Sequence, residues 1–93
     1  MKVKELIASR IEAAFDQVGL TGPAIVQTTS SPKLGDFQVN GVMAAAKKAK
    51  LDPSEKATEV IEAVKLEDIA LEVSFAKPGF INIKLAPDFL KHL

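Results

Sequence analysis

The chain has 93 residues, a formal net charge of zero and no cysteine. This length suits one domain with a single modest core, and 47% hydrophobic with 26% charged residues is typical of a globular chain. The lack of Cys excludes disulfides and thiolate metal sites, and the apolar runs fall well short of the roughly 20 residues of a membrane span. Zero net charge argues against strong general affinity for nucleic acid, so any contact with a polyanion is expected to be local.

Apolar residues recur at three- and four-residue spacing from Val3 to Val18, and Gly19 follows them. This spacing predicts an amphipathic helix that ends at Gly19. Charged residues such as Glu5 and Arg10 interrupt the apolar pattern that a signal peptide would need. We therefore expect a mature start and a cytoplasmic protein.

Two short extended segments and two helices follow. "AIVQTT" (residues 24–29) and "LGDFQVNG" (34–41) are separated by the chain break "SSPK", and both predict strands. Asn40 is expected to be the N-cap of a helix over "VMAAAKKAK". Asp52 is expected to cap the next helix, with Pro53 in its first turn.

The last third of the chain predicts a strand pair. "IALEVSF" (69–75) alternates, with Ile69, Leu71, Val73 and Phe75 on one side and Ala70, Glu72 and Ser74 on the other, and "FINIKL" (80–85) returns after the turn "AKPG". A helix is expected to start near Pro87. The predicted fold is α+β: a two-layer sandwich of a small, mostly antiparallel four-stranded sheet covered by helices, in the order helix-strand-strand-helix-helix-strand-strand. We expect Phe15 and Ile61 at the centre of its core.

No catalytic constellation or metal site is evident in the sequence. The single His, His92, lies at the chain end, where no triad or metal cluster can be assembled. The glycines form no phosphate-binding loop. The lysines of "KKAK" (47–50) are most simply explained as a solvated helix face, with phosphate contact as the less favoured alternative.

The strand "FINIKL" carries unusual residues on the face turned away from the core. If Ile81, Ile83 and Leu85 are buried, then Phe80, Asn82 and Lys84 share the open face. Phe80 could simply fold over the hairpin end, but Asn is disfavoured in strands. An aromatic ring, an amide and a cation are together suited to hold an unpaired RNA base by stacking, hydrogen bonding and phosphate contact.

Two segments, "GDFQVNGVMAAAKKAK" and "PGFINIKLAPDFL", resemble the N-terminal accessory domain of bacterial arginyl-tRNA synthetase. The similarity covers essentially the whole chain. It implies that residues 1–93 are one accessory domain of a longer synthetase and that residues 87–93 begin the helix leading to the catalytic domain. It also implies a tRNA-recognition module that contacts the D-loop at the outer corner of tRNA.

The resemblance assigns tRNA contact to the aromatic-x-Asn pair Phe80 and Asn82, and Phe80 lacks the hydroxyl of the Tyr found in some relatives. Lys84, Gln38 and Lys77 are added as candidate contacts. It further implies no catalytic residue, metal or cofactor in this domain, because the parent enzyme would bind ATP and attach arginine to tRNA through its catalytic domain. The alternative is a protein-interaction or intramolecular docking domain that makes no direct RNA contact.

Overall fold

The computed structural model describes residues 3–29 and 35–90. Predictions that concern residues 30–34 and 91–93, including His92, lie outside the described residues. The elements are α1 (Val3–Val18), β1 (Val26–Thr28), β2 (Phe37–Val39), α2 (Gly41–Lys48), α3 (Pro53–Ala63), β3 (Ala70–Ala76), β4 (Phe80–Leu85) and α4 (Pro87–Leu90). Their order confirms the predicted succession of helices and strands.

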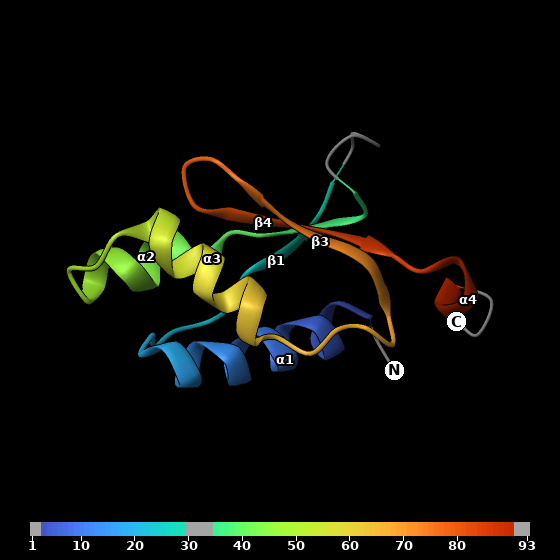
Figure 1. The fold of residues 1–93 in the computed structure, drawn as a ribbon, viewed down its shortest axis with the longest axis horizontal. Helices are drawn as coiled ribbons and strands as arrows, with labels where there is room; N and C mark the ends of the chain where they lie inside the picture. The colour runs from blue at the N-terminus through green and yellow to red at the C-terminus, as the bar shows by residue number, and fades with distance from the viewer. Residues whose placement is uncertain (1–2, 30–34, 91–93) are drawn as a thin grey trace.

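The four strands form one sheet in the order β1-β2-β4-β3, and every neighbouring pair is antiparallel. Helices α1, α2 and α3 lie on one side of this sheet, so the molecule has two layers (Figure 1). The predicted α+β sandwich is therefore confirmed. Among the described residues, no helix has both the length and the apolar character to cross a membrane.

The core lies between the helices and the inner face of the sheet. Ile81 and Ile83 of β4 are fully buried there, as is Phe15 of α1, which confirms Phe15 as a central core residue. Ile61 was wrongly predicted to be central, because it is only half-buried and packs against the rim of the core. Its neighbour Val60 is fully buried instead, since α3 is rotated to direct Val60 inward and Ile61 toward the sheet edge.

Strand β3 departs from the predicted alternation. A register irregularity lies between Ala70, which pairs with Leu85, and Glu72, which pairs with Lys84. The extra residue in this bulge is Leu71, whose side chain is 61% exposed. The predicted alternation of Leu71 with Ile69 and Val73 is therefore wrong, and Phe75 is also exposed.

The residues at the N-caps of α2 and α3 use their side chains differently. Asp52 caps α3 as predicted, because its side chain accepts a hydrogen bond from the Ser54 backbone N–H at 3.2 Å. Asn40 does occupy the N-cap position of α2, but its side chain makes no capping bond there. The amide of Asn40 instead donates to Gln27, which ties the end of β2 to β1.

Two side-chain contacts tie the helical layer together. Lys56 of α3 donates from Nζ to the Val18 carbonyl oxygen at 2.9 Å, which satisfies an acceptor at the C-terminal end of α1. Arg10 of α1 forms a bidentate ion pair with Asp68 in the turn before β3, with Nη2 3.0 Å from Oδ2. The hydrogen bond from Arg10 lowers the pKa of the Asp68 carboxyl below its ordinary value.

Candidate nucleic-acid interface

The face of the sheet turned away from the helices carries the predicted strip. Because β4 is pleated and Ile81, Ile83 and Leu85 are buried, the side chains between them point to the open face. We call Phe80, Asn82 and Lys84 the β4 strip. Phe80 and Asn82 are half-buried and Lys84 is exposed. The helices lie on the other side of the sheet (Figure 1), toward which the buried side chains of β4 point.

Asn82 also belongs to a polar row that crosses all four strands. Residues directly opposite each other in antiparallel pairs share one face, and the register joins Gln27 to Gln38, Gln38 to Asn82 and Asn82 to Ser74. We call Gln27, Gln38, Asn82 and Ser74 the amide row. It meets the β4 strip at Asn82, so this residue lies at the centre of the open face.

Two hydrogen bonds order these amides. Gln38 donates from Nε2 to Oδ1 of Asn82 at 3.0 Å, and Asn40 donates from Nδ2 to Oε1 of Gln27 at 2.6 Å. The Oδ1 atom of Asn40 is buried and has no hydrogen-bond partner among the described residues. The open face therefore presents amide groups whose orientations are set by their neighbours.

The positive charge near the strip is limited. Lys84 pairs in register with Glu72 of β3, so a carboxylate lies across the strand from its ammonium. Lys77 is exposed in the turn between β3 and β4. Asp36, at the start of β2, has a structural role, because its Oδ2 accepts from the Leu85 backbone N–H at 2.7 Å and extends the β2–β4 pairing.

This arrangement can bind a flat polar group more readily than it can perform a reaction. A half-buried ring offers a stacking surface, and an adjacent carboxamide offers hydrogen bonds to the edge of a stacked group. Within residues 3–29 and 35–90, no group of three or more His, Asp and Glu side chains is placed to hold a metal ion.

The structure brings four of the five predicted contact residues to one face. Phe80, Asn82 and Lys84 lie along β4, Gln38 lies beside Asn82, and Lys77 lies apart in the turn. Sequence reasoning missed Gln27 and Ser74, which complete the amide row. Only the strand register identifies them, because each is unremarkable within its own segment.

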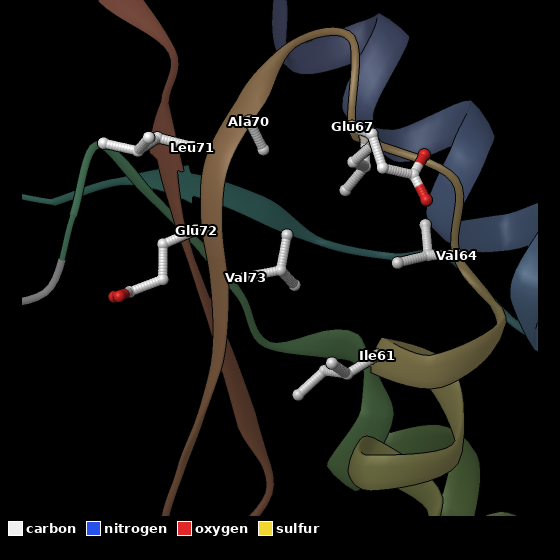
Figure 2. A pocket seen from close by; sticks show the side chains of 8 residues that line it. Ile61, Val64, Glu67, Ala70, Leu71, Glu72 and Val73 are labelled. Carbon is white, nitrogen blue, oxygen red and sulfur yellow. The ribbon is translucent and has the colours of Figure 1, made fainter.

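A second surface feature lies at the free edge of β3. A shallow apolar groove runs between α3 and β3, with Ile61, Val64, Ala70 and Val73 in its lining. Figure 2 shows Ala70 and Val73 directed toward Ile61 and Val64, while Leu71 points to the other side of the strand. The groove lining also includes Leu71 and two carboxylates, Glu67 and Glu72.

The fold and the open face together define a small α+β module whose sheet presents aromatic and amide groups. Over residues 1–85 the chain matches the family described as the arginyl tRNA synthetase N terminal domain. The chain belongs to this family, which confirms the resemblance stated from the two sequence segments.

Individual relatives agree with the family match. The chain is 47% identical over 91 residues to an arginine–tRNA ligase of Chromobacterium violaceum and 44% identical over 92 residues to one of Hahella chejuensis. Each alignment covers 97% of this chain but only 16% of the relative, so the chain spans about a sixth of their length. The arginyl-tRNA synthetase of Thermus thermophilus has the same fold, with a TM-score of 0.83 at 22% identity over 98% of this chain and 15% of that one.

Proposed function

We propose that this chain is the tRNA-recognition module of an arginyl-tRNA synthetase and that its open face contacts the D-loop at the outer corner of tRNA. The parent enzyme would attach arginine to tRNA with ATP, in the cytoplasm, through a catalytic domain beyond residues 87–93. The observation that carries the proposal is that Phe80 and Asn82 lie side by side on the face left open by the helices, in a chain of this family.

Each side chain of the strip would have a separate role. Phe80 would stack on an unpaired base, Asn82 would hydrogen-bond to the edge of that base, and Lys84 would neutralise a nearby phosphate. Gln38 and Lys77 would border the contact, with Lys77 reaching a neighbouring phosphate from the turn. A chain of zero net charge gains little from general electrostatic attraction, so these few contacts would act mainly on selectivity within a larger interface.

The test is aminoacylation by the full-length synthetase that carries this domain. Stacking of one base is worth about 1–3 kcal/mol, so Phe80→Ala or Asn82→Ala should raise KM for tRNA by roughly 5- to 150-fold. The KM values for ATP and arginine should stay unchanged. Gln17→Ala, which removes an exposed amide from α1, is the matched control and should leave all three values unchanged. Unaltered tRNA kinetics in both strip variants, with folding intact, would refute the proposal.

The second candidate function is docking of this domain on the rest of the synthetase, and the β3 edge favours it. Leu71 is 61% exposed next to the apolar groove. The polypeptide leaves β4 beside the start of β3, because the Ala86 backbone N–H donates to the Ile69 carbonyl oxygen at 2.9 Å just before α4. The occupant would be the part of the synthetase that follows, which makes up most of the length of the matched relatives.

Amide hydrogen exchange separates the two functions. Docking predicts that the amides of β3 are better protected in the full-length enzyme than in the 93-residue chain, and that Leu71→Ser removes the difference. Glu62→Gln, a change of an exposed side chain of α3 outside the groove, should preserve it. Equal protection of β3 in the two proteins would refute docking at this edge and would leave the RNA proposal untouched.

A further inference from the structure

The hydrogen bond between Gln38 and Asn82 determines which atoms of Asn82 a ligand can meet. Gln38 lies directly opposite Asn82 in the β2–β4 register and donates from Nε2 to Oδ1 at 3.0 Å. A carboxamide is planar, with its oxygen and its NH2 group on opposite sides. When the oxygen of Asn82 is held toward β2, its NH2 group is directed away from β2. The Nδ2 atom of Asn82 has no hydrogen-bond partner among the described residues.

We infer that Gln38 is a positioning residue that holds Asn82 as a hydrogen-bond donor toward the ligand. The inference rests on the proposed function, in which the β4 strip binds an unpaired base. Under it, the base stacked on Phe80 is read through an acceptor, a carbonyl oxygen or a ring nitrogen, and not through an amino group. Gln38 itself need not touch the RNA.

The physical reason is that an Asn carboxamide held in no single orientation binds a ligand less tightly. A free Asn side chain populates two orientations that exchange donor and acceptor, and the wrong orientation opposes an acceptor with an oxygen. Gln38, opposite Asn82 on β2, is itself half-buried, and this burial restricts the rotation of its side chain. Asn40 and Gln27 form a second hydrogen-bonded amide pair on the same face.

A double-mutant cycle in the full-length synthetase tests this assignment. A neutral hydrogen bond is worth about 0.5–1.5 kcal/mol, so Gln38→Ala should raise KM for tRNA about two- to tenfold while kcat changes little. Because Gln38 acts through Asn82, the same substitution should have no further effect in an Asn82→Ala background. An equal loss in both backgrounds would mean that Gln38 contacts RNA directly, and would overturn the inference.

A reversal experiment adds a readout that a merely structural role would not change. Gln38→Glu places an acceptor opposite Asn82, which should rotate the carboxamide and present Oδ1 to the ligand. Gln27→Glu is the matched control: it adds the same charge to the same row, and its carboxylate still accepts from Asn40. Gln38→Glu should therefore raise KM for tRNA several times more than Gln27→Glu does.

The outcomes separate this inference from the proposed function. If Asn82→Ala leaves KM for tRNA unchanged, the inference fails; if Phe80→Ala leaves it unchanged as well, the proposed function fails too. If Asn82→Ala raises KM but Gln38→Ala does not, only the inference is overturned. Equal losses for Gln38→Glu and Gln27→Glu would attribute the effect to charge and would likewise overturn the orientation argument alone.

Discussion

Replacing Gly41 by Ala should destabilise the domain severely, although Ala is the better helix former. A Cβ atom at position 41 would lie 2.1 Å from the Pro23 carbonyl oxygen and 2.5 Å from that of Ala24. A favourable contact needs roughly 3.5 Å, so the segment before β1 would have to move by about 1 Å or more. That movement would strain two backbone hydrogen bonds, Gly41 N–H to Ala24 at 2.8 Å and Asn40 N–H to Ile25 at 2.9 Å.

The magnitude follows from these opposing terms. Overpacking costs about 1–3 kcal/mol and each weakened hydrogen bond about 1 kcal/mol, whereas removing a helical glycine gains about 0.5–1 kcal/mol. We expect a net loss of about 2–4 kcal/mol in the free energy of unfolding. In a domain of this size, that corresponds to a Tm lower by roughly 10–30 °C.

Urea denaturation of the 93-residue chain is the assay, and Ala44→Gly is the control. Ala44 is exposed in the same helix, so its replacement measures the propensity term alone, about 0.5–1 kcal/mol. A Gly41→Ala chain as stable as the wild type, or more stable, would show that helix propensity outweighs the close approach to Pro23 and Ala24. That result would refute the packing of α2 against the segment before β1.

Two further predictions concern stability. Phe15→Ala should cost about 3–5 kcal/mol because the ring is fully buried, whereas Ile61→Ala at the rim should cost about 1 kcal/mol; comparable losses in denaturation would contradict the observed helix rotation. The ion pair with Arg10 lowers the pKa of Asp68, so its stabilisation should be present above about pH 4 and lost as the pH falls through the lowered value. Wild type and Asp68→Asn should therefore converge in Tm as the pH is lowered below the ordinary range of a carboxyl group, and a difference that stays constant would refute the role of the carboxylate.

The fold could be predicted where one local signal determined each element. The three- and four-residue spacing of α1 and the Asp52-Pro53 start of α3 each fix a helix without knowledge of its neighbours. Strand β3 could not be predicted in the same way. A bulge depends on how β3 pairs with β4, so the exposure of Leu71 is determined by the register and is not visible in the alternation of the segment.

The same distinction applies to the candidate interface. The outward direction of Phe80 and Asn82 followed from pleating, because their neighbours in β4 are strongly apolar. The partnership of Asn82 with Gln38 joins residues 44 positions apart and needed the strand order. Asn40 holds the predicted N-cap position of α2, but its amide binds Gln27 in place of a capping bond, because β1 lies within reach of it.

The two surface features lie on different parts of the sheet, and this separation bears on how the module could work. The amide row crosses the open face through the central strands β2 and β4, whereas the apolar groove lies at the outer edge of β3 beside α3. A partner bound in the groove would contact Ile61 and Val73 without covering Asn82. If both proposals hold, docking and base recognition would use different atoms, and a substitution in one surface should leave the other function measurable.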